Sequence, residues 1–260
     1  MIEANGRGAR TPVGRAFRVL GWMAAADGAD WALGDVARGV EMHPSTVHRV
    51  LGLLEREGLV THDAAGGRYG LGLEFLRLAW RASSRHDLRD VALPWLRGLS
   101  AQTQETAWLG LYEPSRKAMM FAAAVESPQL VRHVRPLGEW LPVHGGATGR
   151  AILAFLPARE RSEILAAPLP ALTERTITDP ERLAVVLEAV RRRGYAVSRG
   201  ERAAGGVGVA APVLDDEGRV LGVVGVGLPE QRFRARDEAR LAALVRACAA
   251  RVAEGAHPGG

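Results

Sequence analysis

The run Ser45-Thr46-Val47-His48-Arg49 places two hydroxyls, an imidazole and a guanidinium close together, directly after Pro44. Proline is favoured at the first position of a helix, where its missing N–H is no loss. Hydroxyls and free N–H groups at a helix start suit contacts with phosphate oxygens. A guanidinium further along the helix can pair with N7 and O6 of guanine in the major groove. We therefore predict that DNA is contacted by Ser45, Thr46, His48 and Arg49.

A helix from Pro44 to Arg56 or Glu57 must carry these side chains. Its apolar residues recur at i, i+3, i+4 and i+7 and form one inward face, made of Val47, Val50, Leu51 and Leu54. The polar residues then point outward, and Gly58 is a natural end for the helix. The same inward pattern would occur in any small helical bundle, where Arg49 and Arg56 would only solvate the surface.

The segments around this helix favour the DNA-binding interpretation. A short helix over residues 34–40 and a turn at 41–43 precede it. Two short strands over 59–62 and 68–71, joined by a glycine-rich turn, follow it. This order predicts a winged helix-turn-helix, with Arg68 on the wing placed to contact a flanking phosphate.

The distribution of charge does not by itself locate a DNA-binding face. The 260 residues carry a formal net charge of +5, but residues 1–90 hold 12 arginines against 11 acids. The exception is the N-terminus, where Glu3 is the only acid among the first residues and the arginines are Arg7, Arg10, Arg15 and Arg18. Such an arm contacts phosphates or a minor groove, or else it is a solvated tail.

The composition excludes several classes of protein. Apolar residues make up 47% of the chain, enough for a globular core, yet no uninterrupted apolar run is long enough to span a membrane. The first residues lack the apolar segment of a secretory signal. The single cysteine, Cys248, excludes an internal disulfide framework and a thiolate zinc cluster, and we expect it to be a small core residue. We expect a cytoplasmic protein without a cofactor or a metal.

The pattern changes after residue 86. Strands are expected over 106–112, 118–125, 130–134, 195–198, 206–214 and 220–228, and helices over 87–102, 149–155, 158–166, 180–193 and 236–254. The helix that ends at Arg193 begins at Thr178-Asp179-Pro180-Glu181, which has capping-box spacing. These elements predict an α+β domain with a mostly antiparallel sheet. The chain then divides into a DNA-binding domain over 10–72, a linker helix over 73–86 and a second domain over 87–255.

Several segments resemble the isocitrate lyase regulator (IclR) family, and their order along the chain strengthens the resemblance. They are residues 35–60, 68–72, 125–128, 141–151, 176–180, 193–197 and 210–213. The resemblance covers residues 12–254. It implies a one-component bacterial transcriptional regulator with a winged helix-turn-helix, a linker helix and a GAF-like domain that binds a small metabolite. Members of the family usually act as dimers or tetramers, and more often as repressors than as activators.

The resemblance also implies an effector pocket lined by Gly146, Ala147, Ser198, Gly208, Gly225 and Gly227. In members that bind small carboxylates, several of these positions are polar. Glycine at three of them removes hydrogen-bonding side chains and leaves space. Each lost partner of a buried polar ligand costs about 1–3 kcal/mol. We therefore expect glyoxylate and pyruvate to bind poorly.

Two interpretations of the glycines remain. Either the pocket takes a larger, more apolar ligand, such as an aromatic one, between the candidate walls Trp108, Leu109, Met119, Met120 and Trp140, or the glycines let the strands pack closely and no ligand binds. An enzyme is the competing class, but the sequence offers no paired acid and base and no phosphate-binding glycine loop. We expect a regulator, a repressor rather than an activator, that binds a palindromic DNA operator as a homo-oligomer and responds to a small-molecule effector.

Overall fold

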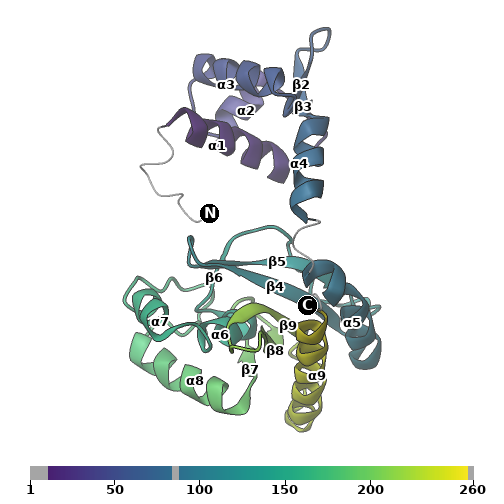
Figure 1. Cartoon of the computed structure of the whole chain (residues 1–260), viewed down its shortest axis with the longest axis vertical. Coiled ribbons are helices and arrows are strands. Elements are labelled where there is room, and N and C mark those ends of the chain that lie inside the picture. Colours follow the sequence, from purple (N-terminus) through teal and green to yellow (C-terminus); the bar gives the residue numbers. More distant parts are fainter. Residues whose placement is uncertain (1–10, 84–87, 257–260) are drawn as a thin grey trace. The chain divides into compact units, whose positions relative to one another are not determined.

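The computed structural model describes residues 11–83 and 88–256. The chain divides into two compact units, residues 1–86 and residues 87–260, and each is described by itself (Figure 1). Among the described residues, no helix is both long enough and apolar enough to cross a membrane.

The N-terminal unit is a winged helix-turn-helix, as the sequence predicted. Its elements are α1 (Pro12–Ala25), β1 (Asp30–Ala32), α2 (Leu33–Gly39), α3 (Pro44–Arg56), β2 (Val60–Asp63), β3 (Arg68–Leu71) and α4 (Leu73–Ser83). The three strands form an antiparallel sheet in the order β1-β3-β2. The wing is therefore supported on its inner side by a strand that precedes the helix-turn-helix.

The helix α3 begins and packs for identifiable reasons. Pro44 occupies the first turn, and the ring of His43 caps the helix by accepting a hydrogen bond from the N–H of Ser45 at 3.3 Å. The four inward residues that the sequence predicted are all buried. They pack with α1, α2 and both wing strands into one core. The polar side of α3 is consequently left outward.

The turn of the wing is closed by Asp63. Its carboxylate accepts hydrogen bonds from the N–H groups of Ala65 (3.0 Å) and Gly66 (3.1 Å). Gly67 has φ +63°, a conformation that suits glycine, and its N–H donates to the carbonyl of Asp63 at 2.7 Å. The hairpin is thus fixed by local hydrogen bonds.

The C-terminal unit is an α+β domain, again as predicted. Its helices are α5 (Leu88–Thr103), α6 (Gly146–Leu153), α7 (Ala158–Leu165), α8 (Pro180–Arg193) and α9 (Glu238–Ala256), with a 3-10 turn, η2 (Ala235–Asp237). Its strands are β4 (Thr106–Glu113), β5 (Ala118–Val125), β6 (Leu141–Pro142), β7 (Ala196–Arg199), β8 (Gly206–Leu214) and β9 (Val220–Pro229). The strands pair antiparallel in the order β6-β5-β4-β9-β8-β7.

Helices cover both faces of this sheet and bury two separate cores (Figure 1). The helices α5 and α9 pack on one face, and α6 and α8 pack on the other. Successive residues of a strand point to opposite faces. On β4, Trp108 therefore lies in the α6/α8 core while Leu109 lies in the α5/α9 core.

The strand expected over residues 130–134 is absent. Leu130, Val131 and Val134 are 98%, 67% and 60% exposed and belong to no strand. The edge of β5 is already occupied by β6 and by an isolated parallel bridge between Phe121 and Leu137. The segment therefore has no strand partner, which its periodicity cannot indicate.

The start of α8 differs from the expected capping box by one residue. Asp179, and not Thr178, is the cap, and its carboxylate accepts a hydrogen bond from the N–H of Arg182 at 2.6 Å. Pro180 then occupies the first helical position. The predicted end is correct, because Gly194 adopts the left-handed conformation, φ +77°, that ends a helix.

Candidate DNA interface and effector site

The outward side of α3 presents the predicted DNA-contacting residues. Ser45, His48 and Arg49 are exposed, and Thr46 is half-buried. The opposite side of the helix is held in the core. An exposed polar face on a rigidly packed helix is the arrangement that reaches base edges in a major groove.

The capping role of His43 was not expected from the sequence. Its Nδ1 accepts the N–H of Ser45 and lies 2.8 Å from the Ser45 hydroxyl. The hydroxyl of Ser45 is therefore engaged with the ring of His43 in this arrangement. Histidine is not among the preferred capping residues, so no sequence signal pointed to it.

The wing residue Arg68 already has an anionic partner. Its guanidinium pairs with the carboxylate of Asp30 and donates to the carbonyl of Asp30 at 2.9 Å. Both side chains are about half exposed. The contact ties β3 to β1, and a phosphate contact of Arg68 remains a prediction.

The N-terminal arginines divide between two settings. Arg7 and Arg10 lie outside the described residues. Arg15 and Arg18 belong to α1, and the guanidinium of Arg18 donates to the carbonyl of Val40 at the turn before α3. Arg18 therefore holds the helix-turn-helix together and is not part of a free arm.

In the C-terminal unit the sheet register brings the predicted effector residues together. Ser198 of β7 lies opposite Gly208 of β8, which in turn lies opposite Gly227 of β9. Two residues before Gly227 on β9, Gly225 lies opposite Trp108 of β4. The N–H of Ala147, next to Gly146 at the start of α6, donates to the hydroxyl of Ser198 at 2.9 Å.

The space expected at two of these glycines is filled. A Cβ atom added at Gly227 would lie 2.4 Å from Cζ3 of Trp108, and one added at Gly225 would lie 3.0 Å from its Nε1 and 2.8 Å from the carbonyl of Val209. The indole is fully buried and donates to the hydroxyl of Thr148 at 3.1 Å. The glycines accommodate this ring, which corrects the expectation that they leave empty space.

The candidate walls are divided by the alternation of the strands. Trp108 and Met119 lie in the α6/α8 core, on the side of the effector residues. Leu109 lies in the opposite core, and Met120 alternates with Met119 along β5, so neither faces these residues. The ring of Trp140 lies beneath the guanidinium of Arg116, whose Cζ is 5.1 Å from the centroid of the ring.

Two arginines that sequence reasoning missed lie at this site. The guanidinium of Arg135 is 4.4 Å from the ring centroid of Trp108 and 5.4 Å from that of Phe121. Its Nη2 would be 3.0 Å from a Cβ at Gly227. Arg202 lies beside Gly146, where an added Cβ would be 3.1 Å from its Nε.

Burial changes the acid–base behaviour of this cluster. It lowers the pKa of Arg135 and of Arg202 to about 10, because a buried guanidinium loses hydration. Burial and the positive charge of Arg135 lower the pKa of His133. Burial and the positive charge of Arg202 lower the pKa of His144. The site therefore holds an excess of positive charge in a partly dehydrated setting.

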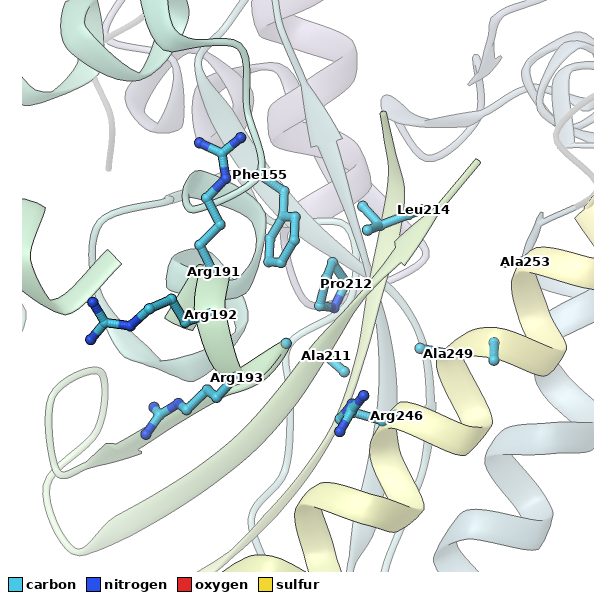
Figure 2. Close-up of a pocket in the computed structure, with 12 residues that line it drawn as sticks. Phe155, Arg191, Arg192, Arg193, Ala211, Pro212, Leu214, Arg246, Ala249 and Ala253 are labelled. Atoms are coloured by element: carbon cyan, nitrogen blue, oxygen red, sulfur yellow. The ribbon is translucent and has the colours of Figure 1, made fainter. Parts of the chain in front are cut away.

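A separate pocket of about 340 Å³ lies between the end of α8, β8 and α9. Its floor includes Phe155 and Pro212. Figure 2 shows the guanidinium groups of Arg191, Arg192 and Arg193 directed away from that floor. Arg246 of α9 also lines the pocket, so its wall combines apolar side chains with arginines.

The thiol of Cys248 is buried. Burial raises the pKa of the Cys248 thiol to about 12, so it is not a reactive thiolate. Within residues 11–83 and 88–256, no three potential metal-ligating side chains lie together.

Two family models match the chain. The IclR helix-turn-helix domain matches residues 12–64, and the model described as the C-terminal domain of the bacterial transcriptional regulator IclR matches residues 80–254. A curated relative, the glycerol operon regulatory protein of Streptomyces coelicolor, is 35% identical over 219 residues, covering 84% of this chain and 85% of the relative.

Solved structures show the same likeness. An IclR-type regulator from Alicyclobacillus acidocaldarius aligns with a TM-score of 0.82 and 31% identity, covering 95% of this chain and 98% of that one. An IclR homologue from Microbacterium hydrocarbonoxydans, complexed with 4-hydroxybenzoate, aligns with a TM-score of 0.81 and 27% identity, covering 94% and 98%.

Proposed function

The chain belongs to the IclR family of DNA-binding bacterial transcriptional regulators, and from this premise we propose that it is a repressor controlled by a small-molecule effector. The observation that carries the proposal is the exposed polar face of α3 on a winged helix-turn-helix. We assign DNA binding to residues 10–72, the linker to 73–86 and effector binding to 87–255. The ligand-bound relative, whose ligand is 4-hydroxybenzoate, supports an effector role for the last of these.

In this proposal α3 enters the major groove. Arg49 and His48 contact base edges, while Ser45 and Thr46 contact phosphates near the helix start. The wing contacts the flanking backbone through Arg68, in exchange for its pair with Asp30.

The operator is proposed to be palindromic and to be bound by a homodimer or a homotetramer. Apolar side chains support self-association of the N-terminal unit: on α1, Val13 and Phe17 are 65% and 70% exposed, and on α4, Leu76 and Trp80 are 62% and 79% exposed. Each pair is spaced to share one side of its helix. Two copies related by a dyad would present their α3 helices to half-sites about 34–36 Å apart.

Operator binding by Arg49→Ala tests the DNA assignment. Genome-wide footprinting supplies the operator, and a salt-controlled titration compares the variant with the wild type. We expect a loss of about 1–3 kcal/mol, concentrated at one base position, without a change in folding. The control is Arg175→Ala, which removes an exposed arginine of the C-terminal unit that pairs with Glu230 at 3.0 Å. Equal affinity of the Arg49 variant and the wild type contradicts the assignment.

A second candidate is a regulator that responds to no effector. The close approach of Gly225 to the neighbouring strand and the filling of the site by Trp108 favour it. Thermal shifts distinguish the two candidates, because an effector that binds only the native state stabilises it by an amount that grows with the ratio of the free effector concentration to its Kd.

A further inference from the structure

The pocket between the end of α8, β8 and α9 is an open groove along an uncovered edge of the sheet. β7 pairs with β8 only over residues 207–210, and within the described residues no strand lies beside residues 211–214 on that side. The groove follows these uncovered residues and has a volume of about 340 Å³. Natural proteins usually cover or block an exposed sheet edge. The groove is therefore a surface on which a further segment of protein could pack.

The groove combines an apolar floor with a positively charged rim (Figure 2). Phe155, Pro212 and Leu214 form the floor together with alanines of α9. An added Cβ at Gly194 would lie 3.4 Å from Nε of Arg246, so this arginine of α9 lies beside the end of α8. The rim is lined by four arginines: Arg191, Arg192, Arg193 and Arg246.

The positive charge of this rim is poorly matched by acids of the same chain. Arg193 lies 4.0 Å from the carboxylate of Glu238, whereas the other three arginines form no ion pair within the described residues. Glu188 lies one helical turn before Arg191 on α8, yet it pairs with none of them among the described residues. Arginines in the last turn of α8 offset the dipole of that helix. The dipole does not account for Arg246, which lies in the middle of α9.

An acidic turn begins one residue beyond the groove. Leu214 lines the floor, and Asp215, Asp216 and Glu217 follow it in the turn between β8 and β9. Arg219 is the one basic residue of the segment 215–219, and it pairs with Asp215 and with Glu217 at 2.7 Å each. Three acids against one arginine leave the turn with an excess of negative charge. Asp216 and Glu217 are both exposed.

We propose that this surface joins two copies of the chain about a dyad, with the acidic turn of each copy against the arginine rim of the other. A dyad contact brings the same surface of both copies together, so that surface must complement itself. Here a basic groove and an acidic turn lie side by side, and a twofold axis between them sets each opposite its complement. The inference rests on the proposed homo-oligomer and adds a contact surface apart from that of the N-terminal unit.

Apolar contacts complete the proposed interface. Leu214 of each copy precedes the acidic turn and would reach the apolar floor of the other copy, which excludes water from the centre of the contact. Because Pro212 has no N–H to offer a neighbouring strand, side-chain contacts rather than one shared sheet would hold the two copies together.

Charge reversal in the groove tests this contact. Arg246 is exposed and makes no hydrogen bond or ion pair within the described residues, so Arg246→Glu leaves the fold intact. Sedimentation equilibrium of the full chain measures the mass of the assembly. We expect the variant to halve the mass of the wild-type assembly and to raise its dissociation constant by on the order of 100-fold, because like charges then face each other. The matched control is Arg240→Glu, which reverses an exposed arginine of α9 that lines a different pocket and should leave the mass unchanged.

A reversal in the acidic turn identifies the partner surface. Glu217→Arg should weaken the association to a similar extent. An equimolar mixture of Glu217→Arg and Arg246→Glu should restore it, because each variant then meets opposite charges on the other. A mixture that fails to associate overturns the proposal. An unchanged mass of the Arg246 variant also overturns it and leaves the groove to another occupant, such as a small anion.

Thermal melting and operator binding separate this proposal from the function on which it rests. Both variants should melt at the temperature of the wild type, since the substituted side chains are exposed. A lower melting temperature together with a mixture that does not associate would assign these residues a structural role and overturn the proposal. A wild type that is monomeric at every concentration would overturn both this contact and the proposed homo-oligomer. Loss of operator binding by the wild type would instead refute the regulator function, whatever the mass of the assembly.

Discussion

The arginines of the two candidate sites lie in opposite environments. Arg49 extends from a helix surface into solvent, and Arg68 is half exposed and paired with Asp30. Arg135 and Arg202 are sheltered in the C-terminal unit, and neither forms an ion pair with an acid of the described residues. A cation that meets the DNA backbone can remain hydrated until it binds, whereas one that selects a buried ligand must lose water in advance. The comparison teaches that exposed DNA-contacting arginines add little to the cost of folding, while sheltered arginines at a candidate effector site add much more.

The largest expected effect comes from filling a glycine of the effector site. Gly227→Val should destabilise the C-terminal unit by about 2–4 kcal/mol, because its side chain collides with the buried indole of Trp108. Chemical denaturation monitored by tryptophan fluorescence and circular dichroism measures the loss. The control is Gly98→Ala in α5, where an added Cβ meets no atom within 4 Å and should not destabilise. Equal stability of the Val variant and the wild type would show that the site is open.

The next effect is a pH dependence of the stability of the C-terminal unit. In the folded C-terminal unit the pKa of His144 lies below its ordinary value of 6.5, because the ring is buried and near Arg202. The unfolded chain therefore binds the proton first, so the stability that His144 contributes is present above about pH 6.5 and is lost as the pH falls through the folded pKa.

Denaturation curves at pH 7.5 and 5.5 measure this loss. His144→Gln should reduce the pH dependence of stability, because it removes the titrating ring. Glutamine can still donate to the carbonyl of Pro170, which accepts from the His144 ring at 2.8 Å. His133 contributes in the same direction, so part of the dependence should persist. An undiminished pH dependence of the free energy of unfolding in the variant would show that His144 does not contribute to it.

A smaller effect is expected in the DNA-binding unit. Asp30→Ala frees Arg68 and removes a negative charge from β1, the strand beside the wing. We expect operator affinity to rise by a few-fold and the salt dependence of binding to steepen by about one ion. The folding free energy should change by about 1 kcal/mol or less, because the pair is exposed. A fall in affinity would mean that the Asp30 contact positions the wing for DNA.

The smallest effect concerns the turn before α3. Glu41 has φ +52°, which costs a residue with a side chain more than it costs glycine. Glu41→Gly should raise the free energy of unfolding of the N-terminal unit by up to about 1 kcal/mol. Thermal melting checks the sign, and a lower melting temperature would indicate that the Glu41 side chain makes a stabilising contact.

The sequence predicted the local features of the fold well. The inward residues of α3, the bounds of β5 and the glycine that ends α8 follow from periodicity and turn chemistry, which act over a few residues. The segment at 130–134 was wrongly predicted as a strand, because a strand exists only where a partner is available. The placement of Leu109 on the effector side failed because the face of a strand depends on the register of the whole sheet.

By itself, therefore, the sequence determined that this chain carries a winged helix-turn-helix and an α+β domain of the IclR family, since ordered local motifs suffice for both. It did not reveal the character of the effector site. Arg135 and Arg202 resemble any other arginine of the chain until folding brings them to Trp108 and Gly146, where neither forms an ion pair within the described residues. Only the tertiary structure decides which charges are paired, because burial and electrostatic pairing depend on distances between residues that are far apart in the sequence.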